Sequence, residues 1–247
     1  MTAEKTGGCD ATPAGYRQVR FVRPPDGTEI VLVRHGETIP APPDDPFPLV
    51  EGQGDPDLGP EGIEQAARLA DRLAGTEIAA IYVTTLRRTA QTAAPLARGV
   101  GLEPKVERDL REVHLGEWEG GIYRKKVIDG DPLALQVLEQ ERWDVIPGAE
   151  SNEAFAERVR RGLSNIARAH VGERVVVVSH GGTIAMALSL ASGSRPFAFI
   201  AADNAGISTI VVTPADWVIR SFNDTAHLSR PAARVVGGAL LRRDPPE

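Results

Sequence analysis

Two short apolar runs, far apart in the chain, end in the same way. Residues 30–33 read Ile-Val-Leu-Val before Arg34-His35-Gly36, and residues 175–178 are four valines before Ser179-His180-Gly181. Such runs are typical of central parallel strands that are covered on both faces. Ligands in open α/β sheets lie outside the carboxyl ends of the strands. We therefore expect His35 and His180 to lie at the same edge of one sheet.

The rest of the chain predicts helices and strands in alternation. Strands are expected at residues 78–83, 206–212 and 217–222, with a helix that continues from the first of them through Ala97. Two more helices are marked by apolar stripes: Ile63, Ala66, Ala67, Ala70 and Leu73 after Gly59-Pro60-Glu61, and Phe155, Val159, Leu163 and Ile166 after the candidate caps Ser151 and Asn152. This order predicts an α/β fold, a three-layer sandwich around a mostly parallel central sheet.

One domain is expected over residues 28–229. A chain of 247 residues with 42% hydrophobic residues can bury a sizeable core. Residues 1–27 lack hydrophobic periodicity and end in Pro-Pro-Asp-Gly, so we expect a flexible N-terminal leader, and residues 230–247 are expected to form a loose tail. Cys9, the single cysteine, lies in this leader and is predicted to be an exposed thiol without an internal disulfide.

The charge pattern favours a small molecule as the partner. The formal net charge is −6, and acidic and basic residues are interspersed, which argues against a general affinity for nucleic acid or anionic membrane. No apolar run approaches the roughly 18 to 20 residues of a membrane span, and the first residues lack the apolar stretch of a signal peptide. We expect a soluble cytoplasmic protein that binds neither nucleic acid nor membrane, and we leave a homodimer open.

Arginines accompany the two histidines. Arg34 adjoins His35, and the predicted turn at residues 84–92 offers Arg87 and Arg88 at the same sheet edge. Two arginines and two histidines that converge are strongly positive and need an anion beside them. A glycine after each histidine lets the backbone approach a ligand, and a helix that starts beyond it presents free N–H groups. These features predict a phosphate site.

Clustered histidines also suggest metal, but the pattern here argues against it. The chain has no His-Glu-x-x-His, no cysteine pair and no closely spaced set of carboxylate and histidine ligands. Arginines within the cluster would repel a cation. We therefore expect neither a metal ion nor another cofactor.

Five blocks of the chain resemble, in the same order, the motifs of the histidine phosphatase superfamily, which includes the cofactor-dependent phosphoglycerate mutases. The blocks are residues 33–38, 58–66, 88–93, 110–112 with 116–120, and 178–181. The resemblance implies a phosphoglycerate mutase-like fold. It also implies that His35 is the nucleophile, that Glu112 is the proton donor, and that Arg34, Arg88 and His180 bind phosphate. Arg87 is the neighbouring alternative, but the family's spacing to Gln91 and Thr92 favours Arg88.

The resemblance leaves three functions open. The leading one is a phosphomonoester hydrolase that acts on a small phosphorylated metabolite through a phosphohistidine. The mutases follow their proton donor with arginine, histidine, tyrosine and glycine, and the arginine and tyrosine contact substrate. Here Glu112 precedes Val-His-Leu-Gly, which favours the phosphatase branch over a phosphoglycerate mutase. A non-catalytic phospho-ligand-binding module is the third reading, although all five functional residues are present.

The chain departs from the family after Thr38, where the family often places an asparagine that contacts phosphate. Here the chain continues Ile-Pro-Ala-Pro-Pro. The proline-rich stretch 39–57 is too stiff and polar for a core element, and we expect it to border the active-site mouth, with residues 122–149 on another side. These two stretches should select the substrate. His114 is expected to be either a substrate contact or a packing residue, and Trp118 a wall or core residue. His170 and His227 are expected to be solvated.

Overall fold

A computed structural model of the chain describes residues 18–42 and 45–229. The predicted tail at 230–247 and most of the predicted leader, including Cys9, lie outside these residues. Residues 18–27 form no helix or strand, and Arg23 ties them to the domain by donating a 2.8 Å hydrogen bond to the carbonyl oxygen of Glu173.

Six strands form the central sheet in the order β5-β4-β6-β1-β7-β8. Their bounds are β1 Thr28–Arg34, β4 Ala80–Val83, β5 Lys105–Val106, β6 Arg174–Ser179, β7 Ile207–Val212 and β8 Trp217–Asp224. Neighbouring strands are parallel except where β7 pairs with β1 and with β8. The prediction of a mostly parallel sheet is therefore confirmed. A separate small hairpin pairs β2 (Leu49–Val50) with β3 (Gln53–Gly54).

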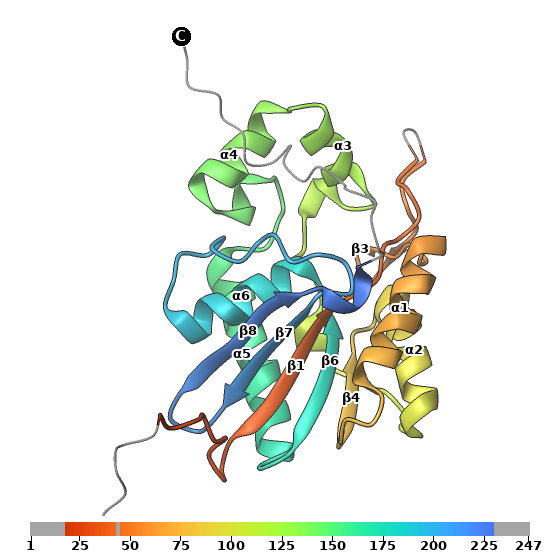
Figure 1. Ribbon diagram of the computed structural model, residues 1–247. Coiled ribbons are helices and arrows are strands. Elements are labelled where there is room, and N and C mark those ends of the chain that lie inside the picture. Colours follow the sequence, from red (N-terminus) through yellow and green to blue (C-terminus); the bar gives the residue numbers. More distant parts are fainter. Residues whose placement is uncertain (1–17, 43–44, 230–247) are drawn as a thin grey trace, which may run out of the picture.

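Helices cover both faces of the sheet. They are α1 Pro60–Leu73, α2 Arg87–Val100, α3 Ile122–Ile128, α4 Pro132–Gln140, α5 Asn152–Ala169 and α6 Gly181–Ser192. Short 3-10 turns stand at Arg108–Leu110, Gly116–Trp118, Trp143–Val145 and Ala226–Leu228. In Figure 1, α1 and α2 lie on one side of the sheet and α5 and α6 on the other, whereas α3 and α4 lie above the upper end of β1. This is the three-layer arrangement that the sequence predicts. None of the described helices is long and apolar enough to cross a membrane.

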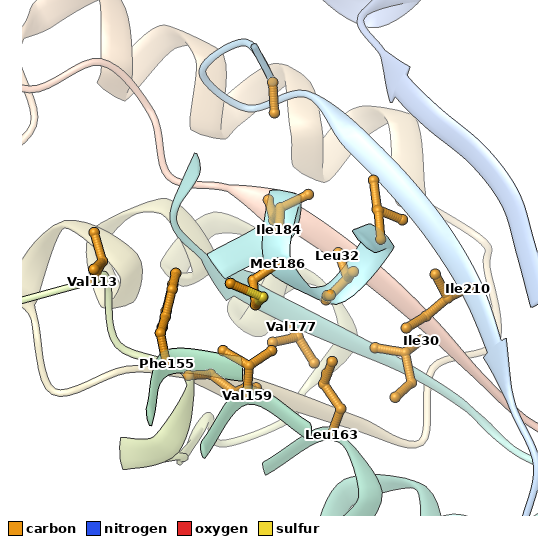
Figure 2. Close-up of a cluster of buried hydrophobic side chains, with 14 of the residues drawn as sticks. Ile30, Leu32, Val113, Phe155, Val159, Leu163, Val177, Ile184, Met186 and Ile210 are labelled. Carbon is orange, nitrogen blue, oxygen red and sulfur yellow. The ribbon is translucent and has the colours of Figure 1, made fainter. Parts of the chain in front are cut away.

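The strands are apolar on both faces because each face meets a different helix pair. Ile30 and Leu32 of β1 belong to the core cluster with α5 and α6, and Val31 and Val33 belong to the cluster with α1 and α2. Figure 2 shows the first cluster, in which Phe155 and Val159 of α5 approach Val177 of β6. Side chains of a strand alternate between its faces, so a run without polar residues requires two covered faces.

The apolar face predicted for α1 is right in part. Ala66 and Leu73 are buried as predicted, but Ile63 is 62% exposed, and the helix also buries Gly62 and Leu69. The reason is a close approach of two backbones: a Cβ atom added to Gly62 would lie 2.0 Å from the carbonyl oxygen of Glu37. Because of that contact, Gly62 faces inward and Ile63 faces solvent. The order of apolar residues in the sequence does not reveal such a backbone contact.

Two histidines that the sequence predicts to be solvated are not. His170 is buried at the end of α5, where Nε2 lies 3.0 Å from the hydroxyl of Tyr82 and Nδ1 lies 2.7 Å from a carboxylate oxygen of Glu173. His227 is half-buried in the 3-10 turn that packs on α1. In both cases an element end folds back onto the domain, so a terminal position does not imply exposure.

The stretch 39–57 also contributes more to the interior than predicted. Phe47, Gln53 and Asp55 are buried, and the β2–β3 hairpin lies within the stretch. The two polar side chains are buried because they are hydrogen-bonded: Gln53 donates to main-chain oxygens, and Asp55 accepts from Arg87. Polarity therefore does not exclude a buried position when every polar group finds a partner.

Candidate active site

The register of two strands brings the two histidines together. Arg34, the last residue of β1, pairs with Ser179, the last residue of β6. Each histidine follows its strand directly, and the imidazole rings of His35 and His180 lie edge to face with centroids 5.3 Å apart. The prediction that both lie at one sheet edge is confirmed.

The ring of His35 is held in one tautomer. Its Nδ1 lies 2.8 Å from the carbonyl oxygen of Gly36, and a carbonyl oxygen only accepts hydrogen bonds, so Nδ1 carries the proton. The lone pair is thereby left on Nε2, as a nucleophile requires. The main chain of His35 is fixed by Ser179, whose carbonyl oxygen accepts from its N–H at 2.9 Å, and by Asn204, whose amide donates to its carbonyl at 2.9 Å.

His180 lies behind His35 and has no exposed surface. Its Nε2 lies 3.1 Å from the hydroxyl of Thr84, whereas its Nδ1 is buried without a partner. A buried polar atom left without a hydrogen bond costs about 1–3 kcal/mol. A ligand oxygen that reached this buried Nδ1 would supply the missing partner.

Arg34 and Arg88 supply positive charge without a direct ion pair. Arg34 donates from Nη1 to the carbonyl oxygen of Ala202 at 2.6 Å, and its Nε is buried without a partner. Arg88 donates from Nη1 to the carbonyl oxygen of Gly54 at 2.9 Å. Among the described residues, no carboxylate lies within 4.0 Å of either guanidinium. Burial lowers the pKa of both, to about 10 for Arg88, so an anion in the cavity would be bound favourably.

Arg87, the neighbouring alternative, faces away from this site. Its side chain is half exposed and pairs with Asp55 at 2.9 Å and Asp57 at 3.3 Å. The structure therefore brings Arg88, and not Arg87, to the two histidines.

The carboxylate of Glu112 is held by two main-chain N–H groups. One oxygen accepts from Val113 at 3.0 Å, and the other accepts from Gly182, in the first turn of α6, at 3.2 Å. The side chain thus spans from its own loop to the helix that His180 precedes. It faces the same cavity as His35 and Arg88.

Two residues that the sequence analysis did not single out fix the Glu112 loop. Arg158 of α5 donates to the carbonyl oxygens of Asp109, Arg111 and Glu112 at 2.7–2.8 Å and forms an ion pair with Glu150 at 2.7 Å. Gln53 donates to the carbonyl oxygens of Glu112 and Val113. These contacts are made to main-chain atoms across long stretches of sequence, so no local motif signals them.

The cavity has a volume of about 230 Å³ and two kinds of lining. Charged groups gather around His35, and an aromatic wall is formed by Phe47, Trp118, Tyr123 and Trp143. Burial, and then the charge of Glu112, raise the pKa of Tyr123 to about 12, so its hydroxyl keeps its proton. Trp118 is therefore both buried and a wall residue, and both predicted stretches, 39–57 and 122–149, border the cavity.

His114 lies outside the cavity. Its Nδ1 accepts from the N–H of Gly116 at 3.2 Å, and it lines a neighbouring open hollow with Glu51 and Arg108. Of the two alternatives for His114, the structure supports the packing role.

The family model of the histidine phosphatase superfamily, branch 1, matches residues 30–225 of the chain. The chain belongs to the histidine phosphatase superfamily. Because this match covers most of the chain, the resemblance of the five sequence blocks is confirmed.

The relatives that are similar to this histidine phosphatase include proteins named as phosphatases and proteins named as mutase-like. The metal-independent phosphoserine phosphatase of Arabidopsis thaliana is 35% identical over 82% of this chain and 84% of its own length. Phosphoglycerate mutase-like protein 4 of the same plant is 36% identical over 82% of this chain and 88% of its own. Among solved structures, a phosphoserine phosphatase mutant of Entamoeba histolytica in complex with phosphoserine aligns with a TM-score of 0.68 at 26% identity, covering 82% of this chain and 100% of that one.

The residues that the structure describes contain no group of three histidine, cysteine, aspartate or glutamate side chains that could hold a metal ion. The carboxylate of Glu112 and the two histidines are accompanied instead by the guanidinium groups of Arg34 and Arg88.

Both site histidines should be neutral in the folded histidine phosphatase well below pH 6.5. Burial, and then the charge of Arg88, lower the pKa of His35 and of His180 well below the ordinary value. The unfolded chain takes up protons on them near pH 6.5, whereas the folded chain does not. The free energy of unfolding should therefore fall as the pH drops below 6.5, by up to about 1.4 kcal/mol per histidine for each pH unit.

Denaturant unfolding at pH 7.5 and pH 5.5, in buffers without phosphate, tests this sign. The wild type should lose more stability between the two pH values than the His35→Ala variant, because the variant lacks one of the two groups. All other titrating residues are common to both proteins. An equal loss in both would contradict a depressed pKa for His35.

Proposed function

We propose that this histidine phosphatase is a phosphomonoester hydrolase that acts on a small phosphorylated metabolite through a phosphohistidine on His35. One observation carries the proposal: His35, with its lone pair on Nε2, shares a cavity with two guanidinium groups that form no direct ion pair and with the carboxyl of Glu112. A nucleophile, an anion site and a proton donor are the groups that metal-free phosphoryl transfer requires. Residues 28–229 are proposed to act as one catalytic domain.

In the first half-reaction, the phosphoryl oxygens bind Arg34, Arg88 and the unpartnered Nδ1 of His180. Nε2 of His35 attacks phosphorus as the bond from phosphorus to the ester oxygen breaks. Glu112, protonated, gives its proton to that departing oxygen, so the alcohol leaves neutral. The imidazolium that forms keeps its Nδ1–H bonded to the carbonyl oxygen of Gly36.

In the second half-reaction, water attacks the phosphohistidine. Glu112, now a carboxylate, takes one proton from this water as the new oxygen–phosphorus bond forms and the nitrogen–phosphorus bond breaks. Inorganic phosphate leaves, and both His35 and Glu112 return to their starting states. The arginines act throughout on the charge of the equatorial oxygens, which is the main contribution a protein makes to phosphoryl transfer.

Two lines of support favour hydrolysis over a mutase reaction. Val113 and Leu115, which follow Glu112, line the cavity with apolar groups where the mutases carry an arginine and a tyrosine that contact substrate. Relatives named as phosphoserine phosphatases match over most of this chain in both sequence and structure. The similarity to a mutase-like protein keeps the mutase reaction as the alternative to be tested. The cytoplasmic location and the oligomeric state stay predictions.

The test is a panel of phosphorylated metabolites, including phosphoserine, incubated with the enzyme in EDTA without added metal. We expect phosphate release from at least one substrate at a rate that EDTA leaves nearly unchanged, since the arginines supply the charge that a metal would otherwise provide. A second reaction contains 3-phosphoglycerate with 2,3-bisphosphoglycerate, and both inorganic phosphate and 2-phosphoglycerate are followed.

Three outcomes would overturn parts of this proposal. Formation of 2-phosphoglycerate faster than any phosphate release would show a mutase. Loss of activity in EDTA that a divalent ion restores would contradict the metal-independent mechanism. Phosphate binding without release from any member of the panel would show a non-catalytic module.

A further inference from the structure

A third arginine faces the cavity and has not been given a role. Arg124 of α3 stands at the cavity mouth, and the residue as a whole is exposed to solvent. Its Nη2 reaches inward and donates to the hydroxyl of Thr38 at 2.7 Å, and its Nη1 donates to the carbonyl oxygen of Ile39 at 3.3 Å. The guanidinium also lies 5.6 Å from the centre of the Phe47 ring. The side chain is therefore held in place before any ligand binds.

The guanidinium of Arg124 has N–H donors that the protein does not use. Of the five N–H donors in a guanidinium, two are used by Thr38 and Ile39. No carboxylate among the described residues lies within 4.0 Å of it. Glu119, the other acid in the cavity lining, has both oxygens committed to the N–H groups of Gly54 and Leu115.

The phosphoryl group does not need this third arginine. Arg34, Arg88 and His35 line the same cavity, and two guanidinium charges match the charge of about −1.5 to −2 on a phosphomonoester. Arg124 lines the same cavity but is exposed to solvent, whereas Arg88 is buried. The charge of Arg124 is thus placed for a second anionic group of the substrate.

The shape of the cavity limits what that group is. A volume of about 230 Å³ fits a small phosphorylated metabolite, in which a second anion would lie a few bonds from phosphorus. Arg34, Arg88 and Arg124 are the only lysine or arginine side chains in the described lining, which also contains four aromatic side chains. A guanidinium binds a carboxylate in a planar, bidentate pair, a fit that small neutral alcohols do not offer.

We infer that Arg124 is a specificity-determining residue that binds a carboxylate of the substrate, and that the substrates are small phosphomonoesters with a carboxylate close to the phosphate. This inference rests on the proposed hydrolase function. It assigns the selective role of the 122–149 stretch to one side chain, anchored on the residues that directly follow the His35 motif.

Two matched substrate pairs test the inference. Phosphoserine and phosphoethanolamine differ only by a carboxylate, and 3-phosphoglycerate and glycerol 3-phosphate differ by a carboxylate in place of an alcohol. The wild type should prefer the carboxylated member of at least one pair. In Arg124→Met, the ratio of kcat/KM values within that pair should fall by about 10- to 100-fold, the usual effect of losing a charge-assisted pair, and mainly through KM. Arg124→Lys should retain part of the ratio.

The ratio separates carboxylate recognition from a general disturbance of α3, because a displaced helix would slow both members of a pair. Lys125→Met is the matched control on the same helix: the Lys125 side chain is 56% exposed and is outside the cavity lining, so the ratio should stay at the wild-type value. Equal losses for both members in Arg124→Met, or a wild type without preference for the carboxylated member, would overturn the inference.

A binding measurement distinguishes failure of this inference from failure of the proposed function. Calorimetric titration of the His35→Ala protein with phosphoserine and phosphoethanolamine needs no turnover. Tighter binding of phosphoserine that is lost in the His35→Ala, Arg124→Met double variant would support the carboxylate site even if no substrate were hydrolysed. Equal affinity of both ligands for the His35→Ala protein would contradict it, whatever the activity of the wild type.

Discussion

Replacing His35 with alanine should lower turnover by roughly a thousandfold or more while the protein stays folded. Among the described residues that line the cavity, His35 is the only histidine, and there is no cysteine, serine or threonine; His180 lies behind His35, with its Nε2 3.1 Å from the hydroxyl of Thr84. The ring of His35 makes one hydrogen bond, to the carbonyl oxygen of the next residue, so its removal costs the fold little beyond the ring contact with His180. The main-chain bonds to Ser179 and Asn204 do not depend on the side chain.

Phosphate release and thermal unfolding of the variant check both halves of this expectation. His170→Gln is a useful control, since His170 is also a buried histidine but lies at the opposite end of the sheet, bonded to Tyr82 and Glu173. That control should lose stability and keep its turnover. Turnover of His35→Ala at the wild-type rate would remove His35 from the mechanism.

Replacing Glu112 with glutamine should slow the hydrolysis of alkyl phosphates by about 10²- to 10⁴-fold. An alkoxide is a poor leaving group that needs a proton, and an amide does not supply one. The hydrolysis rate of p-nitrophenyl phosphate should fall far less, because its leaving group hardly needs protonation. Glutamine also offers only one acceptor oxygen to the N–H groups of Val113 and Gly182, so part of the remaining loss comes from positioning.

A second variant tests the same role without changing the acid itself. A Cβ atom added to Gly182 would lie 2.5 Å from a carboxylate oxygen of Glu112, so Gly182→Ala forces that carboxylate to move while alanine suits the helix. Gly181→Ala is the control: the three atoms nearest to its added Cβ belong to Arg34, the closest at 3.5 Å, which is an ordinary van der Waals distance.

Gly182→Ala should therefore slow alkyl phosphates more than p-nitrophenyl phosphate, as Glu112→Gln does, and Gly181→Ala should keep most of its activity. Equal losses on both substrates in Glu112→Gln and in Gly182→Ala would count against Glu112 as the proton donor.

Local sequence patterns were sufficient to predict the site residues that directly follow strands. The apolar runs before His35 and His180 require central strands, and parallel neighbours end at the same sheet edge, so the two histidines had to meet. The choice of Arg88 over Arg87 came from the resemblance. Its physical basis is visible only in the structure, where Asp55 and Asp57 hold Arg87 outside.

Contacts between distant segments could not be predicted in this way. The face of α1 is set by a backbone contact between Gly62 and Glu37, which leaves no trace in the order of apolar residues. Arg158 and Gln53 donate hydrogen bonds to main-chain oxygens of the Glu112 loop. Every residue has a main-chain oxygen, so the sequence does not show which of them are bound. The sequence does not distinguish Arg124 from other helix arginines, because its contact with Thr38 joins segments that are far apart in the chain.

The central claim is that the phosphoryl group passes through His35. Wild-type enzyme mixed with substrate, stopped within one turnover by alkali, and digested under alkaline conditions should yield a single phosphorylated peptide, which mass spectrometry should assign to His35. The modification should be stable in alkali and lost in acid, as expected of a phosphorus–nitrogen bond, and it should be absent from the His35→Ala protein. Steady phosphate release without any phosphorylated peptide, or an acid-stable phosphate on another residue, would contradict this account.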